Sequence, residues 1–418
     1  MSYLSKNIKN SIKSLFIKKN KKNNDQVLLH EPTFNHEEIC AALVPLISTR
    51  VTMGKKVFEF EKKYSDKIKS KYSIMCNSGS SANLLMLSSL SSKFVKNNLK
   101  PGDEVIVPAL SWSTSVWPII QNNLIPVFVD CSLDTFNLKI DDLKKSLTKK
   151  TKAILLVHVY GNPCDMKEIV NFAKKNNLIL IEDCCESMGA TYNNIPVGNF
   201  GLLSSFSLYY SHHITSMEGG ICVTKNFELS ERMRIMRAHG WSRETERKNY
   251  YIKKYKKIDP RFIFLDLGYN LRPTELQAAM ATVQLKKLNE IIKKRRANHF
   301  KIKKIFLEYE DYFSIQKEQP NSKASWFGFA FNINPKKINY EKFASYLKKN
   351  KIENRPVIAG NMLKHPVMTA HKYKKYTSLE NSNYIMKNGM AIGCHQSIND
   401  IQLAKIKKTI KKYIQFHG

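Results

Sequence analysis

Apolar and polar positions along the chain follow two patterns that change near residue 70. Before that point, residues 35–47 and 56–68 carry apolar side chains every three to four positions, which predicts two amphipathic helices joined by an irregular loop. From residue 70 onward, short apolar runs rich in β-branched residues alternate with helical stretches. The predicted strands are 72–77, 104–109, 125–130, 153–160 and 178–183.

This alternation is typical of a mainly parallel sheet covered by helices on both faces. A long helical pattern then opens at Pro273, a residue suited to the first turn of a helix. Beyond it, residues 325–333 predict a strand and residues 339–350 predict a helix. We therefore expect an α/β protein with a large domain over residues 31–297 and a smaller α+β domain over residues 298–418.

The first 30 residues are rich in lysine and differ from the rest of the chain. Leu4, Ile8, Ile12 and Leu15 recur at helical spacing among these lysines, as in a helix that lies on a membrane surface. A frayed basic tail explains the same pattern. We interpret residues 1–30 as such a tail.

Net charge could point to a nucleic-acid partner. The 418 residues include 68 Lys and Arg against 35 Asp and Glu, which gives a formal net charge of +33. The lysines are spread along the whole chain, however, and no DNA-binding motif accompanies them. We interpret the charge as a lysine-rich surface that helps to hold an anionic nucleotide substrate, and we expect no nucleic-acid partner.

Hydropathy argues against a membrane-spanning or secreted protein, and cysteine spacing argues against a cysteine-based metal or redox site. No apolar run approaches the ~18 residues of a membrane-spanning helix, and the N-terminus lacks the pattern of a signal peptide. We expect a cytoplasmic protein without stable membrane insertion. The eight cysteines are scattered, with no C-x-C or C-x-x-C pair, so we expect reduced thiols and no metal site.

Three segments place polar or aromatic groups where strands give way to helices, the edge at which open α/β sheets bind ligands. In NSGSSANLL, Gly79, Ser80 and Ser81 would offer amides and hydroxyls to a phosphate at a helix N-terminus. In LILIEDCCESMGA, the carboxylate of Asp183 could hold a protonated pyridine nitrogen. In PALSWSTSVWP, the indole of Trp112 could stack on a planar cofactor. Taken singly, these residues fit ordinary turns, helix caps and core positions equally well.

The loop SLYYSHHITSMEGG, residues 207–220, completes the set. In this order and at these spacings, the four segments resemble the DegT/DnrJ/EryC1/StrS family of pyridoxal-phosphate enzymes that act on nucleotide sugars. The resemblance covers about residues 35–415. It implies an aspartate-aminotransferase-like fold of type I, with a central, mainly parallel seven-stranded sheet and a smaller C-terminal domain.

In that family the loop contains a serine and, five positions later, the lysine that binds the cofactor covalently. Here Ser207 matches the serine and a Glu-Gly-Gly sequence follows as expected, but His212 occupies the lysine position. Histidine cannot tether the cofactor, although with a reference pKa near ~6.5 it can act as a general acid or base. Within the family, this replacement is typical of the sugar 3-dehydratases.

The resemblance implies a reaction in two halves. Glutamate, the expected amino donor, converts pyridoxal 5'-phosphate to pyridoxamine 5'-phosphate, which then reacts with the 4-keto group of a nucleotide-diphosphate 4-keto-6-deoxy sugar. His212 would remove a proton from the cofactor, and the hydroxyl at carbon 3 would leave. Such products serve deoxysugar biosynthesis for surface polysaccharides, including lipopolysaccharide O-antigens.

The resemblance also implies roles for other residues. His239 and Arg355 would contact the substrate, and Asn270 would reach the cofactor phosphate of the neighbouring subunit, so that a homodimer shares its active sites. His213 could compete for the role of base, but the spacing from the serine favours His212. The implied cofactor-binding residues are Gly79, Ser80, Ser81, Trp112, Asp183, Glu186, Ser207 and Asn270.

Two other hypotheses compete with this one. An iron–sulfur 3-dehydratase of CDP-4-keto-6-deoxyglucose shares the histidine but has a C-x-C-x7-C cluster after its HG motif, whereas this chain has no cysteine between Cys222 and Cys394. A non-catalytic binding protein of the same fold would have lost the lysine with its activity, yet the other cofactor positions are intact. The missing lysine itself disfavours an ordinary aminotransferase. The nucleotide and the sugar stay open at this point.

Overall fold

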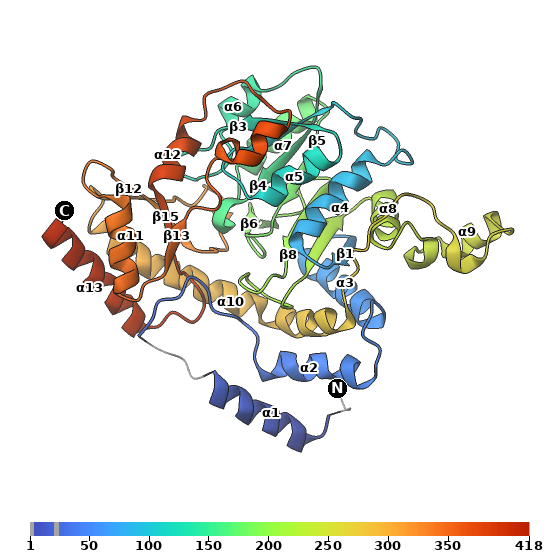
Figure 1. Ribbon diagram of the computed structural model, residues 1–418, viewed down its shortest axis with the longest axis horizontal. Coiled ribbons are helices and arrows are strands. Elements are labelled where there is room, and N and C mark those ends of the chain that lie inside the picture. Colours follow the sequence, from blue (N-terminus) through green and yellow to red (C-terminus); the bar gives the residue numbers. More distant parts are fainter. Residues whose placement is uncertain (1–3, 21–24, 418) are drawn as a thin grey trace.

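A sheet of eight strands organises the larger part of the molecule (Figure 1). The structure is a computed structural model and describes residues 4–20 and 25–417. The strand order is β1-β9-β8-β5-β4-β2-β3-β14, and only β9 runs against the others. The strands are β1 Tyr72–Cys76, β2 Glu104–Pro108, β3 Ile125–Val129, β4 Thr151–Val157, β5 Ile179–Asp183, β8 Leu203–Ser207, β9 Gly220–Thr224 and β14 Lys374–Lys375.

The predicted fold class is confirmed, with one difference in the number of strands. Seven strands are five or seven residues long, as a seven-stranded sheet requires, and the two-residue strand β14 adds an eighth beside β3. Strand β14 is a pair of exposed lysines, Lys374 and Lys375. Its backbone pairs with β3, and Lys374 Nζ also lies 2.7 Å from Glu104 Oε1 of β2, so the strand is held without apolar side chains and leaves no apolar pattern in the sequence.

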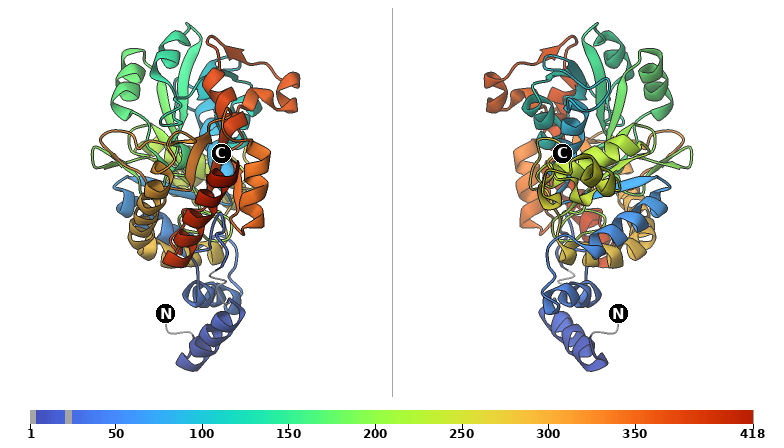
Figure 2. Two further views of the ribbon diagram at one scale, coloured as in Figure 1. Left: turned by 90° about the vertical axis from the view of Figure 1, so that its left-hand side faces the viewer. Right: turned by 90° about the vertical axis from the view of Figure 1, so that its right-hand side faces the viewer.

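Helices cover both faces of this sheet because its strands bury side chains on both sides (Figures 1 and 2). Val105 and Val107 of β2 pack in one apolar cluster with α4, α5 and α8, whereas Ile106 between them joins the opposite cluster with α6 and α7. Helices α3 and α10 cover the β8–β9 end of that opposite face. These helices are α3 Lys55–Ile68, α4 Gly79–Ser91, α5 Ser113–Gln121, α6 Ile140–Lys145, α7 Met166–Lys175 and α8 Phe227–Arg237.

A smaller antiparallel sheet, in the order β10-β12-β15-β13, forms a second core in the C-terminal part. The predicted strand is present as the shorter β12, and the predicted helix is present as α11. The elements here are β10 Phe313–Ile315, β12 Phe329–Ile333, β13 Asn354–Pro356, β15 Gly389–Ile392, α11 Tyr340–Lys349, α12 Glu380–Asn388 and α13 Asp400–His417. A third, three-stranded sheet consists of β6 Thr191–Tyr192, β7 Ile195–Pro196 and β11 Ser322–Lys323.

Helix α10, Glu275–Leu307, connects the two main sheets as one uninterrupted 33-residue helix. It begins with a capping box in which Thr274 and Gln277 satisfy each other's backbone N–H groups. Because α10 continues through the predicted domain boundary after residue 297, the helix belongs to both parts. The division into 31–297 and 298–418 stays a prediction.

Residues 6–19, which we interpreted as part of a frayed tail, form helix α1, Lys6–Lys19. Ser5 caps the helix by accepting the N–H of Ile8, and α1 packs beside α2, His36–Ile47. This contact explains the order, because an isolated helix of this length is marginal in water. Together α1 and α2 project from the base of the molecule (Figure 2). Residues 1–3 and 21–24 of the predicted tail lie outside the described residues.

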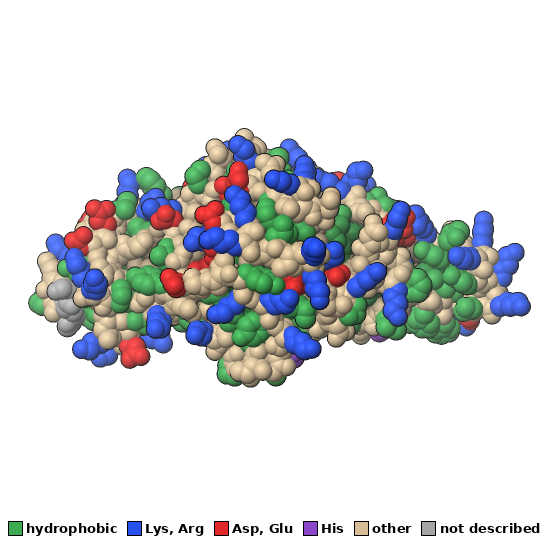
Figure 3. Space-filling model, turned by 90° about the horizontal axis from the view of Figure 1, so that it is seen from above, with side chains coloured by type: hydrophobic (Ala, Val, Ile, Leu, Met, Phe, Trp, Pro, Cys, Tyr) green, Lys and Arg blue, Asp and Glu red, His purple; other side chains and the backbone are tan. Residues whose placement is uncertain are grey.

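Basic side chains are spread over the face shown in Figure 3, among apolar and acidic groups, rather than gathered in one block. A further exposed helix, α9 Lys248–Lys254, extends from one side of the molecule (Figure 1). None of the described helices combines the length and the apolarity that crossing a membrane requires.

Candidate active site

Asp183 is the last residue of β5 and lies at the carboxyl edge of the large sheet. Its Oδ2 accepts hydrogen bonds from Asn83 Nδ2 at 2.8 Å and Ser115 Oγ at 2.6 Å, and its Oδ1 accepts the N–H of Cys185 at 3.0 Å. These donors are neutral, and among the described residues no cation forms an ion pair with Asp183, so hydrogen bonds hold the carboxylate in one orientation. A fixed carboxylate of this kind fits a protonated pyridine nitrogen.

The start of α4 and the end of β8 meet in a close contact suited to a phosphate. A Cβ atom on Gly79 would lie 2.7 Å from Ser207 Cβ and 3.0 Å from Ser207 Oγ, so only glycine fits there. Ser78 caps α4 by accepting the N–H of Ser81 at 3.0 Å, and Ser80 is exposed beside it. The unpaired N–H groups and the positive end of the helix dipole at this terminus favour an anion.

Gly220 brings the loop between β8 and β9 against the same helix start. A Cβ atom on Gly220 would lie 2.0 Å from the carbonyl oxygen of Ser78. This approach positions the predicted histidine loop next to the phosphate cradle. The glycines of the Glu-Gly-Gly sequence are therefore explained by packing of the loop.

His212 lies in this loop with its imidazole partly buried. Its ring packs against the rings of Phe327 at 4.9 Å and Tyr209 at 5.8 Å between centroids. Among the described residues, Nδ1 of His212 is buried and has no hydrogen-bond partner. Burial lowers the pKa of His212 to about 3, and the charges of Arg295, Arg355 and His30 act in the same direction.

The reference pKa of histidine, ~6.5, does not apply to His212 in the folded protein, because its surroundings lower that pKa. With a pKa of about 3, the ring of His212 is neutral over the whole physiological range and is always in the form that accepts a proton. The physical cause is mainly desolvation, because burial penalises the charged imidazolium. His212 is therefore a ready but weak base in the protein without ligands.

His213 lies on the other side of the loop and is fully buried. Its Nε2 lies 2.7 Å from the backbone oxygen of Ser325, which ties the loop to the segment before β12. Burial lowers the pKa of His213 well below its usual range, so this ring is neutral as well. The rings of both histidines lie near Phe327, but only His213 has a hydrogen-bond contact from its ring, to the backbone of Ser325.

Glu186 and Arg355 approach each other from the two main sheets. Glu186 Oε1 lies 4.0 Å from Nη2 of Arg355, and its Oε2 accepts the N–H of Tyr160 at 2.9 Å. Burial raises the pKa of Glu186 to about 7, although the charge of Arg355 opposes this shift. Arg355 also donates to the hydroxyl of Tyr160 at 3.1 Å and lies over the ring of Phe327. Tyr160, Phe327 and Arg355 line one small recess together with His30.

Arg295 of α10 lies fully buried behind this recess. Its Nη1 donates to the carbonyl oxygens of Trp326 at 3.2 Å and Phe327 at 3.0 Å. Its Nε and Nη2 have no hydrogen-bond partner among the described residues, and burial lowers its pKa to about 10. The guanidinium therefore stays charged and fixes the backbone that carries Phe327.

Trp112 precedes α5 and is 53% exposed, so it is not a core residue. Three residues later on the same helix, Ser115 donates to Asp183. The exposed indole is thus carried by the element that also contacts the strand-end carboxylate, which suits stacking on a ligand.

His239 and Asn270 belong to an outer rim, residues 238–272. The two strands of this rim pair at Ala238 and Asn270, and the N–H of His239 donates to Tyr269 O at 2.7 Å. The side chain of Asn270 is exposed and accepts a hydrogen bond from Arg272 Nε at 3.0 Å. The rim runs beside the start of α4, where Asn77 N–H donates to Leu271 O. Within the described part of the chain, no hydrogen bond, ion pair or ring contact joins His239 or the side chain of Asn270 to His212 or Asp183.

Several residues of the site were missed by sequence reasoning. Asn83 could have been found, because it follows Gly79 by one helical turn on α4 and so lies on the same side of that helix. Tyr160 could also have been noted, because it follows β4 at the same edge of the sheet as Asp183. Arg295 and Phe327 give no local signal, because they reach the site through the packing of α10 and the C-terminal part against the large sheet.

One buried cluster has the side chains of a metal site. Donor atoms of His158, Glu182 and Cys184 lie within 4.8 Å of one another. Glu182 already accepts the N–H groups of Gly198 at 2.8 Å and Gly201 at 2.6 Å, and it lies 3.2 Å from His158 Nε2. These hydrogen bonds account for the cluster without an ion.

The fold and the strand-end site define the class of pyridoxal-phosphate enzymes of fold type I. Residues 33–411 match the model of the DegT/DnrJ/EryC1/StrS aminotransferase family, and the chain belongs to this family. GDP-4-keto-6-deoxy-D-mannose 3-dehydratase of Escherichia coli is 40% identical over 374 residues, which cover 88% of this chain and 95% of that protein. The resemblance inferred from the motifs is confirmed, and with it the enzyme class and the cofactor class.

Two solved structures of GDP-4-keto-6-deoxymannose-3-dehydratase match the fold. A His-to-Asn mutant with bound GDP-perosamine has a TM-score of 0.87 at 38% identity, over 92% of this chain and 100% of that chain. A second structure, with a trapped PLP-glutamate geminal diamine, has a TM-score of 0.84 at 36% identity, over 92% of this chain and 99% of that chain.

Proposed function

We propose that this protein removes the C3 hydroxyl of a GDP-linked 4-keto-6-deoxy sugar, with pyridoxal 5'-phosphate as cofactor and glutamate as amino donor. The observation that carries the proposal is His212, whose buried Nδ1 is unpartnered at the position where the family has its lysine. The substrate and donor classes are inferred from the relatives with bound GDP-perosamine and trapped glutamate.

The residues of the inner site fit the cofactor in a single orientation. Asp183 would bind the pyridine nitrogen, Trp112 would stack on the ring, and Gly79, Ser80 and Ser207 would surround the phosphate. When bound, the cofactor supplies an electron sink for a carbon next to its amine.

His212 performs the proton transfer in this proposal. Its neutral ring accepts a proton at the unpartnered nitrogen, and the ring contacts with Phe327 and Tyr209 hold it in place. The charges of Arg295 and Arg355 disfavour the protonated ring, so the proton is held only briefly and can be passed on. Glu186, which lies beside Arg355 and has a pKa of about 7, can donate or accept a proton at neutral pH.

The proposal includes a homodimer in which Asn270 completes the phosphate site of the partner. Its exposed side chain and the exposed apolar side chains nearby, Leu267 at 86% and Phe264 at 56%, support a covered rim. His239 would then approach the sugar from the same rim. A shared site of this kind requires a two-fold, self-complementary interface.

Incubation with pyridoxal phosphate, glutamate and a panel of GDP- and CDP-linked 4-keto-6-deoxy sugars tests the proposal. We expect the GDP-linked sugar to lose its C3 oxygen in a reaction that depends on glutamate, as measured by mass spectrometry. An amino sugar that keeps the C3 hydroxyl would identify an aminotransferase and contradict the proposal. Loss of the hydroxyl only from the CDP-linked sugar would contradict the assigned nucleotide.

A further inference from the structure

Helix α1 lies outside the part of the chain that matches the family. The match begins at residue 33, and the Escherichia coli relative is covered over 95% of its length but covers 88% of this chain. In Figure 2, α1 projects with α2 from the base of the molecule. The helix is therefore an addition to the family fold, and the dehydration chemistry gives it no role.

Helix α1 differs from the C-terminal helix α13, which is also rich in lysine, in the exposure of its apolar side chains. Both helices have lysines and regularly spaced apolar residues. In α13 Leu403, Ile406 and Ile410 are buried in the core of the small sheet, although Ile401 and Phe416 are exposed. None of the residues of α1 is buried, and Ile8, Leu15 and Ile17 are 47%, 62% and 59% exposed. Helix α1 also contains five lysines and no acidic residue. The protein thus leaves part of the apolar side of α1 uncovered.

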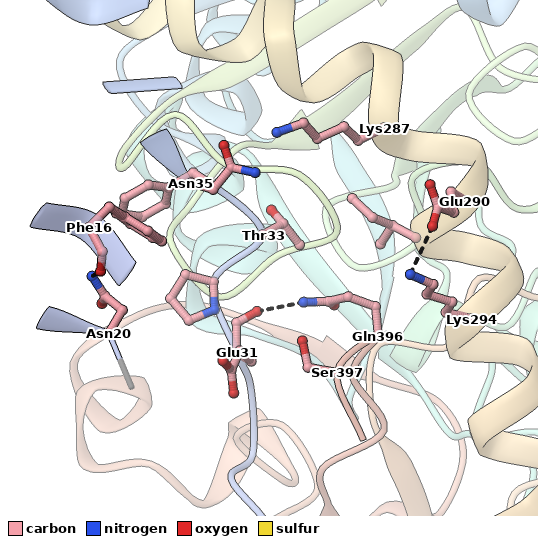
Figure 4. Close-up of a pocket in the computed structure, with 13 residues that line it drawn as sticks. Phe16, Asn20, Glu31, Thr33, Asn35, Lys287, Glu290, Lys294, Gln396 and Ser397 are labelled. Carbon is pink, nitrogen blue, oxygen red and sulfur yellow. Dashed lines mark hydrogen bonds and ion pairs between the residues drawn. The ribbon is translucent and has the colours of Figure 1, made fainter. Parts of the chain in front are cut away.

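The body of the protein contacts α1 only loosely. A cavity of about 420 Å³ separates the end of α1 from α10, with Phe16 and Asn20 on one side and Lys287 and Lys294 on the other (Figure 4). The lysines on the α10 side are paired with acidic neighbours. Ile12 and Phe16 are partly buried on α1, while Leu15 is directed elsewhere and stays exposed.

We propose that α1 binds the surface of an anionic lipid bilayer, with Ile8 and Leu15 entering the boundary between headgroups and acyl chains. Lysines on a helix of about 21 Å favour a phosphate-rich surface, and the apolar side chains need a layer that admits them. A nucleic acid offers phosphates but no such layer. The homodimer proposed above uses the rim at residues 238–272, and a second copy of this chain, with 68 Lys and Arg against 35 Asp and Glu, suits the five lysines of α1 less well than an anionic lipid surface does.

Cosedimentation of the full-length holoprotein with vesicles tests this proposal. We expect binding to vesicles of phosphatidylglycerol and phosphatidylethanolamine, weaker binding in high salt, and little binding to phosphatidylcholine alone. Leu15→Glu should lower the bound fraction ~tenfold or more, because it removes the free energy gained when a leucine side chain is buried in the bilayer. Activity and helix content should not change, since α1 is remote from the site.

Ile17→Glu is the matched control. It makes the same charge change at a similarly exposed apolar residue of α1, but two positions further on, which is nearly the opposite face of the helix. We expect Ile17→Glu to keep most of the binding.

Three outcomes would overturn the proposal: no binding of the unaltered protein to anionic vesicles, equal losses in the two variants, or a change of oligomeric state in Leu15→Glu without an effect on vesicle binding. The last result would assign the exposed side of α1 to a second copy.

Discussion

The site has an inner half, which consists of Asp183, Gly79, Ser207 and His212, and an outer rim, residues 238–272. The two differ in how completely the side chains of one chain enclose them. In the inner half, Asp183 is buried and receives hydrogen bonds from four neutral donors, and Gly79 lies directly against Ser207. In the rim, the side chains of Asn270 and of its apolar neighbours face solvent. The packing of the chain itself thus forms the proposed cofactor pocket, whereas the rim is open to solvent and we propose that a second chain covers it.

Several buried polar atoms near the site lack a hydrogen-bond partner among the described residues, including Nδ1 of His212, Nδ1 of His213, and Nε and Nη2 of Arg295. Buried polar atoms are nearly always hydrogen-bonded, because leaving one unpaired costs free energy, so such atoms are available to a bound ligand. The carboxylate of Asp183, by contrast, accepts hydrogen bonds at both oxygens. Among the unpaired atoms, only Nδ1 of His212 belongs to the residue at the position of the family's lysine, which is why we assign the proton transfer to it.

The largest effect is expected from a change within the inner half that removes the base. His212→Asn should lower the rate of hydroxyl loss ~10²–10⁴-fold while cofactor binding is retained, because asparagine is polar but has no basic nitrogen. His213→Asn is the control, since His213 contacts Ser325 O, and it should keep most of the activity. Near-full turnover of His212→Asn would move the role of base to another residue.

Glu186 should make the free energy of unfolding of the protein depend on pH. Burial raises its pKa from 4.5 to about 7, so the folded state binds more protons than the unfolded state between these values. Stability is therefore lost as the pH rises through about 7. Glu186→Gln should remove this loss, which is up to about 3 kcal/mol at pH 8.

Urea unfolding of the two proteins at pH 5 and pH 8 measures this effect. The variant should gain stability relative to the unaltered protein at the higher pH only. An equal difference at both values would mean that the carboxyl does not titrate in this range.

A smaller effect is expected from filling the phosphate cradle. Gly79→Ala places a Cβ atom 2.7 Å from Ser207 Cβ, so the start of α4 must move away from β8. We expect a loss of about 1–3 kcal/mol in the free energy of unfolding and weaker cofactor binding. Ser80→Ala removes only an exposed hydroxyl and should cost less in both. Calorimetry and cofactor titration measure the two effects, and equal results for the two variants would contradict the cradle.

Much of the inner half could be predicted from sequence because its signals are local. Asp183 ends an apolar strand, Gly79 starts a helix, and Ser207 and His212 keep the family spacing within one loop. The contribution of Phe327 and Arg295 could not be predicted, because it arises when the C-terminal part packs on the large sheet. The low pKa of His212 has the same origin, since desolvation depends on those distant neighbours.

The N-terminal segment is a second example of a structure that the sequence alone did not determine. The apolar spacing of Ile8, Ile12 and Leu15 was visible in the sequence, but the spacing alone does not decide between a helix and a frayed tail. The contact with α2 and the capping by Ser5 decide it. Marginal helices are specified by the surfaces on which they pack.

The smallest effect is expected from a substitution in the rim. Combined with subunit mixing, it tests whether a second chain completes the site. Asn270→Ala should weaken cofactor binding with little change in stability, because its side chain is exposed. Mixing this variant with His212→Asn should restore activity to at most about a quarter of the normal value, since one site of each mixed dimer is free of both changes. If subunit exchange is verified and no activity returns, each chain builds its site alone.

We propose that the inner half binds its cofactor without a covalent bond to a lysine and that His212 takes the place of that lysine. Borohydride reduction of the holoprotein, followed by peptide mass spectrometry, distinguishes covalent from noncovalent binding, with His212→Lys as the positive control. We expect no cofactor-linked peptide from the unaltered protein and a linked peptide containing position 212 from the control. A cofactor bound to any lysine of the unaltered active site would show that the binding is covalent and that His212 does not replace the lysine.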